Sequence, residues 1–365
     1  MFNPRFERAK FIAFKMYLSS AFYNAQQKSS ALRRYENANP AENGWVHTMV
    51  VAALLFSLSA AMPIATRAQA TKSTKPHTEP VVVEPMMLGQ ASPPEGVAPA
   101  FSPNGKLVCF GKRVGKSMSI FESEEKHGKW SAPRVASFSG RYTDLEPAFD
   151  PHGRYIIFAS NRPLEPEGPP AEGNYDGEVR PGKGGHLWRV DRIGNHWGEP
   201  APLPGRINES SSMFSPAIEA DGSLYWMRPP TPGEHFHLYR SQMTNDKYAD
   251  PERVSFSNLA AYGDFDPVVA PDGSFLIFSS PRPPSPPHRS DLFIVYREGQ
   301  GWSKPVDLAD VISPDVYGVE ARLSPDRKTL YFTNSRRLAS DPPESTENPY
   351  VQHTWQVDLS LLKLP

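Results

Sequence analysis

The sequence predicts an all-β protein, namely a five-bladed β-propeller built from four-stranded antiparallel blades. Three observations support this prediction. A short turn motif between apolar runs occurs five times, and an aromatic-x-x-proline motif follows four of the copies. The copies recur at roughly 50-residue spacing, which suits one propeller blade each. The 40 prolines among 365 residues also disfavour a mainly helical chain.

The turn motif marks the hairpin between the first two strands of each unit. Asn-Gly and Asp-Gly pairs between apolar runs predict tight hairpins, because glycine tolerates positive φ. The last copy has Arg327 in place of glycine, so we expect its turn to be the least regular. The five copies are Pro103-Asn104-Gly105, Pro151-His152-Gly153, Ala220-Asp221-Gly222, Pro271-Asp272-Gly273 and Pro325-Asp326-Arg327.

The aromatic-x-x-proline motif marks the fourth strand. Its aromatic residues are Trp130, Trp197, Tyr248 and Trp302. Between the two motifs lies a short strand-like run such as "HLWRV" or "DLFIV". Each of the first four units therefore has strands a to d in order, and the five blades are expected to start near residues 95, 143, 212, 263 and 317. One large aromatic at the same place in each blade predicts packing between blades.

The fifth unit has strands a, b and c but no aromatic-x-x-proline strand after them. The segment "EPVVVEPMML", residues 79–88, precedes the first blade and has no partner of its own. We expect this N-terminal strand to pair into the last blade and close the ring, because a free sheet edge invites aggregation. The propeller domain then spans residues 71–365.

The N-terminal region predicts export. An apolar core at about residues 50–65 precedes the small-x-small pattern Ala68-Gln69-Ala70, as in a secretory signal peptide cleaved near residue 70. Residues 1–70 would form the leader, and the mature protein would be periplasmic or secreted. A start at Met49 instead of Met1, an uncleaved signal anchor and an organelle transit sequence are the alternatives. No later stretch reaches the ~20 apolar residues of a membrane span, so we expect none in the mature form.

The repeat resembles a known family. The Pro-Asp-Gly turn, "IFSS" with Arg282 after it, the Asp-Leu-aromatic strand and the Trp-x-x-Pro run from Trp302 to Leu308 resemble the TolB-like β-propeller repeat family, a WD-repeat-like type found in exported bacterial proteins. The resemblance covers roughly residues 95–360. It implies a β-propeller fold. It implies no particular activity, because one fold hosts many chemistries.

Charged residues recur at the ends of the predicted inner strands. Three acids begin strand a near the axis, two more precede them in the similar stretches "YTDLEP" and "YGDFDP", and an arginine follows strand b. Structural ion pairs are one interpretation. The other interpretation is a charged opening at the propeller axis that binds a polar ligand or a cation. Calcium suits such oxygen ligands. The ligand-binding candidates are Glu146, Asp266, Glu320, Asp144, Asp264, Arg162, Arg282 and Arg336.

The sequence favours binding over catalysis. It contains no nucleophile-elbow, P-loop, H-E-x-x-H or CxxC motif, and we expect no cofactor besides the calcium alternative. A net charge of −1 predicts no bulk attraction to nucleic acid. We expect a ligand on the face that carries the long b–c loops, with an envelope or extracellular protein, peptide or saccharide as partner. An extracellular hydrolase or lyase that uses the axial carboxylates, with or without a divalent cation, is the alternative.

Overall fold

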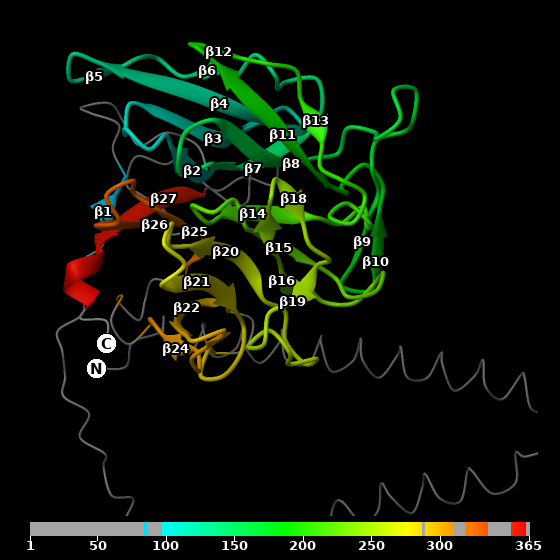
Figure 1. Ribbon diagram of the computed structural model, residues 1–365, viewed down its shortest axis with the longest axis vertical. Coiled ribbons are helices and arrows are strands. Elements are labelled where there is room, and N and C mark those ends of the chain that lie inside the picture. The colour runs from blue at the N-terminus through cyan, green and yellow to red at the C-terminus, as the bar shows by residue number, and fades with distance from the viewer. Residues whose placement is uncertain are drawn as a thin grey trace, which may run out of the picture. The chain divides into compact units, whose positions relative to one another are not determined.

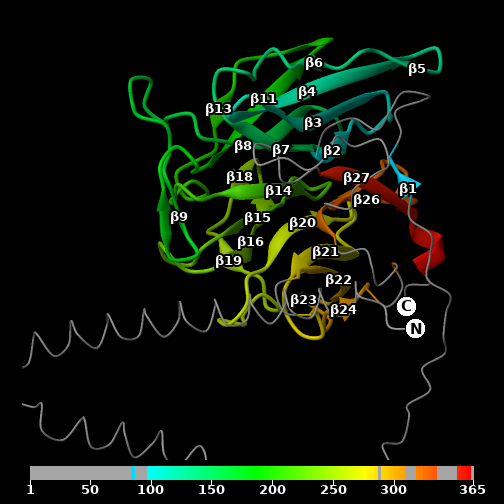
Figure 2. The same ribbon diagram turned by 180° about the vertical axis from the view of Figure 1, so that it is seen from behind.

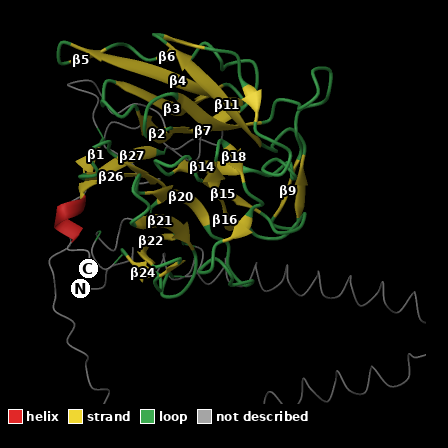
Figure 3. Cartoon of the chain, in the orientation of Figure 1, coloured by secondary structure: helices red, strands yellow, loops and turns green. Residues whose placement is uncertain are grey.

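The structure is a computed structural model, and it describes residues 84–86, 97–286, 289–309, 312, 318–334 and 352–362. Strands and loops make up nearly all of this part of the chain, with one short 3-10 turn, η1 (Leu359–Leu362) (Figure 3). No helix in the described part is long and apolar enough to cross a membrane. The predicted leader lies outside the described residues.

Five antiparallel sheets surround a common axis, as predicted (Figure 1). The innermost strand of each sheet contacts the innermost strand of the next, and the fifth contacts the first, so the ring is closed. In chain order the inner strands are β2 (Val97–Phe101), β7 (Asp144–Phe149), β14 (Phe214–Ile218), β20 (Phe265–Val269) and β25 (Val319–Leu323).

The second strand of each blade is mostly buried. The run "YIIFAS" in blade two is buried at every position, because a blade packs against a neighbour on each face. The second strands are β3 (Leu107–Val114), β8 (Tyr155–Ser160), β15 (Leu224–Arg228), β21 (Phe275–Ser280) and β26 (Thr329–Asn334). The third strands are β4 (Ser117–Lys126), β11 (His186–Ile193), β16 (His237–Ser241), β22 (Asp291–Glu298) and β27 (His353–Asp358).

The outer strand of the first four blades is split into two short pieces, which the sequence did not predict. The aromatic motif forms β5 (Lys129–Trp130), β12 (His196–Trp197), β18 (Lys247–Tyr248) and β23 (Gly301–Trp302). These pieces pair with the end of the third strand or, in blade three, with β17 (Met243–Thr244) just after it. Beyond the proline, the chain pairs again with the third strand as β6 (Arg134–Val135), β13 (Ala201–Pro202), β19 (Glu252–Arg253) and β24 (Val306–Asp307).

The first and last strands of the described part of the chain meet in blade five. The short strand β1 (Glu84–Pro85) pairs antiparallel with β27, and the two lie side by side in Figures 1 and 2. The N–H of Met86 also donates to the carbonyl of Thr354 (2.9 Å). The rest of the predicted closing strand, residues 79–88, lies outside the described residues apart from 84–86. Closure by that whole segment therefore stays a prediction.

All five a–b turns have the same geometry. In each, the N–H of the fourth residue donates to the carbonyl of the first, for example Gly105 to Ser102 (2.8 Å) and Arg327 to Ser324 (2.9 Å). Gly105 has φ 69° and Arg327 has φ 59°. The expectation of an irregular last turn was wrong, because a residue with a Cβ can adopt the left-handed conformation at a cost of ~1–2 kcal/mol.

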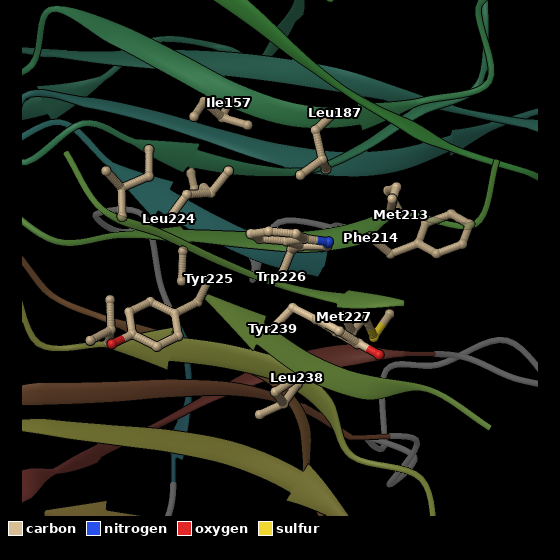
Figure 4. Close-up of a cluster of buried hydrophobic side chains, with 14 of the residues drawn as sticks. Ile157, Leu187, Met213, Phe214, Leu224, Tyr225, Trp226, Met227, Leu238 and Tyr239 are labelled. Carbon is tan, nitrogen blue, oxygen red and sulfur yellow. The ribbon is translucent and has the colours of Figure 1, made fainter. Parts of the chain in front are cut away.

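Aromatic side chains pack the blades together. In Figure 4, the neighbouring residues Tyr225 and Trp226 of β15 point to opposite faces of blade three, with Trp226 toward Leu187 of blade two. On the other face, the rings of Tyr225 and Trp302 of blade four lie 6.2 Å apart. Trp197 of blade two donates its Nε1–H to Oε2 of Glu122 in blade one (2.8 Å). The predicted packing role of the repeated aromatic is confirmed for these two tryptophans.

Candidate functional site: the propeller axis

A repeated backbone feature sets the axial residues. One residue near the start of every inner strand, the third in β7 and the second in the other four, is in the left-handed region, and the pairing of that strand shifts register at this point. Such a β-bulge re-aims a side chain out of the normal strand alternation. The five residues are Ala98 (φ 51°), Glu146 (54°), Ser215 (49°), Asp266 (52°) and Glu320 (55°). Three of the predicted site residues therefore occupy equivalent positions around the axis.

These acids join one blade to the next. The N–H of Ser215 donates to Oε2 of Glu146 (2.7 Å), and the Ser215 hydroxyl donates to Oδ1 of Asp266 (2.7 Å). The N–H of Glu320 in turn donates to Oδ2 of Asp266 (3.1 Å). The hydrogen bonds thus run from blade two to blade five. Among the described residues, Oε2 of Glu320 has no hydrogen-bond partner, so the series ends there.

Glu146 and Glu320 retain their protons more readily than free glutamates. Burial first, and then the negative charge of the nearby Asp266, raise the pKa of Glu146 to about 8 and that of Glu320 to about 7. Within the part of the chain that the structure describes, no three His, Cys, Asp or Glu side chains are placed to hold a metal ion. The geometry therefore gives the calcium alternative no support.

The other candidates form two separate ion pairs, one within each of two blades. Nη2 of Arg162 donates to Oδ1 of Asp144 (2.8 Å), and both side chains are buried. Arg282 and Asp264 repeat this pair at 2.5 Å in blade four. Each arginine also donates to a serine hydroxyl on the second strand and to a backbone carbonyl before the inner strand. These contacts match the structural interpretation of the charges. Arg336 lies outside the described residues.

A cavity of about 420 Å³ lies on the axis, and all five blades line it. Its walls come from the inner strands beyond the bulge and its rim from the a–b turns. The cavity therefore lies toward the face opposite the long b–c loops, where we had not expected a site. Most of its wall is apolar; one wall residue from each blade is Ala100, Phe149, Ala217, Val268 and Leu323.

Arg322 in this wall is the residue that sequence reasoning missed. At the same position of the bulge, two residues after the left-handed one, the other blades have Ala100, Ala148, Ala217 and Val268. Only 5% of Arg322 is exposed. Its Nη1 donates to the carbonyl of Ala321 (2.7 Å), whereas Nε and Nη2 have no hydrogen-bond partner among the described residues. Aligning the five repeats would have singled it out as the one charged residue in this set.

Comparisons with known proteins add similarity of fold only. No protein-family model matches the sequence, and no curated protein matches it. A structure assigned as TolB from Agrobacterium tumefaciens is similar at 14% identity and TM-score 0.43, over 72% of this chain and 76% of that one. TolB from Acinetobacter baumannii is similar at 19% identity and TM-score 0.37, over 57% of this chain and 43% of that one. A GH62 hydrolase in complex with xylotriose is similar at 11% identity and TM-score 0.44, over 76% of this chain and 97% of that one.

Proposed function

We propose that this chain is a ligand-binding propeller and that its ligand occupies the axial cavity. The observation that supports this proposal is the cavity itself, of about 420 Å³, to which every blade contributes. Small-molecule sites are typically preformed, mostly apolar hollows of about 300–1,000 Å³ with a few polar groups. Here the polar lining residues are Asp150, Asp272, Arg322, Ser324 and Arg327, and the rest of the wall is formed chiefly by alanine, valine, proline and phenylalanine.

The location of the protein, the closure of its ring and its partner surface are also proposals. The signal-peptide pattern of residues 49–70 supports export to the periplasm or beyond, and N-terminal sequencing of the exported protein would locate the cleavage point. We propose that residues 79–88 complete blade five. We keep the b–c face as the proposed surface for a larger partner, that is, an envelope or extracellular protein, peptide or saccharide.

A cavity-filling variant tests the ligand site. Ala217→Leu places a larger side chain in the cavity, and Ala201→Leu makes the same change at an exposed position of β13. Both proteins are screened by ligand-observed NMR against a panel of small organic acids, amides and sugars. We expect the hits of the wild type to be lost in Ala217→Leu and kept in Ala201→Leu. Equal binding by all three proteins, or a panel without hits, would refute the cavity as the site.

A hydrolase or lyase is the second candidate, because the raised pKa values of Glu146 and Glu320 suit groups that exchange protons near neutral pH. The test is turnover of glycan and lactone substrates by the wild type and by Glu320→Gln. Activity that is lost in the variant would support this candidate. A thermal shift with calcium and with EDTA tests the metal alternative in the same experiment.

A further inference from the structure

We propose that the ligand of the axial cavity is a neutral molecule with a hydrocarbon body, such as an alkyl alcohol, ester or amide. This inference rests on the proposed function and names the class of ligand. It follows from three properties of the cavity lining: its polar side chains already have partners or are buried, its formal charges cancel, and the rest of its wall is apolar.

The polar side chains of the lining are engaged within the protein. The pairs are Asp150 with Arg154, Asp272 with Arg327, and Ser324 with Asp326. Arg322 donates through Nη1 to the carbonyl of Ala321, and its Nε and Nη2 are buried, so a ligand in the cavity does not reach them. A polar ligand would therefore lose its hydration and gain few hydrogen bonds in return.

The formal charges of the lining cancel. Its ionisable residues are two acids, Asp150 and Asp272, and two arginines, Arg322 and Arg327. An anion or a cation in the cavity therefore meets no excess of opposite charge. An ionised end must either be buried without a partner, which is costly, or stay in water at the rim, which leaves less of the ligand body inside. Both outcomes weaken the binding of ions and favour a neutral ligand.

The rest of the wall predicts the body of the ligand. Seven of the lining residues are prolines, which have no N–H to donate. Larger apolar side chains come from four of the blades, namely Phe101, Phe149, Ile218 and Leu323. Removal of such a surface from water is favourable roughly in proportion to its area. A hydrocarbon chain or ring gains this free energy without needing a hydrogen bond. A free sugar, with many hydroxyl groups, does not.

The test compares 1-octanol, octanoate and octylammonium, which share a chain length and differ in the charge of one end, by isothermal titration calorimetry at pH 7 on the whole protein. We expect 1-octanol to bind at least about tenfold more tightly than either ion. Its binding should show a negative heat-capacity change, as burial of apolar surface predicts. Ala217→Leu, which fills the cavity, should abolish this binding, and Ala201→Leu on the exposed strand β13 should keep it.

A charge placed in the wall should reverse the preference. Leu323 lines the cavity and is half-buried on β25, so Leu323→Lys brings an ammonium group to the wall. We expect this variant to bind octanoate more tightly than 1-octanol. The matched control is Val306→Lys, at an exposed position of β24 outside the cavity, which should keep the wild-type order. The wild-type order in a folded Leu323→Lys protein would place the binding of these compounds elsewhere and overturn the inference.

The outcomes separate this inference from the proposed function. If either ion binds the wild type as tightly as 1-octanol does, the neutral ligand is overturned and the cavity remains a ligand site. No binding of any of the three compounds would overturn both. A heat-capacity change near zero would overturn apolar burial as the source of the affinity. These comparisons use the wild type, so they hold even if Leu323→Lys fails to fold.

Discussion

The backbone N–H of Ser215 donates to Oε2 of Glu146 at 2.7 Å, across the boundary between blades two and three. The two residues are 69 positions apart in the chain, and each is the left-handed residue of its inner strand. Glu146 is thus at once a link between blades and a member of the coupled acid group on the axis. Its protonation should therefore affect the stability of the whole ring.

Glu146→Gln should stabilise the protein at alkaline pH. The folded-state pKa of Glu146, about 8, lies above its ordinary value of 4.5. The folded state therefore binds more protons than the unfolded state between these values, and the free energy of unfolding falls as pH rises through this window. Glutamine keeps an acceptor for Ser215 and carries no charge. We expect a gain of ~1–3 kcal/mol at about pH 9 and little change at about pH 4.

Urea unfolding at pH 4, 7 and 9 measures this effect. The matched control is Glu167→Gln at an exposed position of the blade-two loop, which should leave the pH dependence as it is in the wild type. A Glu146→Gln protein with the pH slope of the wild type would show that this carboxyl titrates normally.

Asp144→Ala should destabilise the fold by ~3–5 kcal/mol, because it leaves the buried guanidinium of Arg162 without its carboxylate. The double variant Asp144→Ala/Arg162→Met should recover part of that loss. Chemical unfolding gives both values. Asp191→Ala is the control, since its pair with Arg189 is largely exposed and should contribute less than ~1 kcal/mol. Similar losses in Asp144→Ala and Asp191→Ala would argue against the structural role of the Arg162 pair.

Two glycines of the a–b turns should respond differently to alanine. Gly105 and Gly273 share φ 69°, but a Cβ at Gly105 meets nothing within 4 Å, whereas one at Gly273 would lie 2.8 Å from Oε1 of Glu219. Gly105→Ala should cost ~1 kcal/mol from backbone strain alone. Gly273→Ala should cost ~2 kcal/mol or more, because Glu219 must move away from Arg297. Equal melting temperatures for the two variants would contradict this prediction.

Trp197→Phe tests the contact between blades one and two. Phenylalanine keeps a ring beside Phe138 and Phe149 but removes the Nε1–H that donates to the buried carboxylate of Glu122. We expect a loss of ~1–3 kcal/mol for that hydrogen bond and ~3–5 kcal/mol for Trp197→Ala. A double-mutant cycle with Glu122→Gln isolates the hydrogen bond. A coupling energy near zero would assign the role of Trp197 to packing alone.

Local patterns made the blades predictable. The Pro-Asp-Gly turns, the apolar runs beside them and the repeated aromatics act over a few residues, so their spacing revealed the strands, the turns and five blades. The same reasoning missed the split outer strand, because the chain's return after Pro133 or Pro305 to the third strand depends on contacts made only after the blade forms. The sequence also predicted that the turn at Arg327 would differ from the other four a–b turns, but the folded structure tolerates the backbone strain there.

The sequence by itself determined the all-β class, the repeat and the places where charges recur, because periodic apolar residues and turn residues act locally. Only the tertiary structure decided what those charges do. It paired Asp144 with Arg162 and Asp264 with Arg282, and it gathered Glu146, Asp266 and Glu320 at one axis. It also placed Arg322 in the wall of a mostly apolar cavity, with Nε and Nη2 buried and without a hydrogen-bond partner among the described residues. The reason is physical: hydrogen bonding and burial depend on distances between blades, and residues far apart in the chain set those distances.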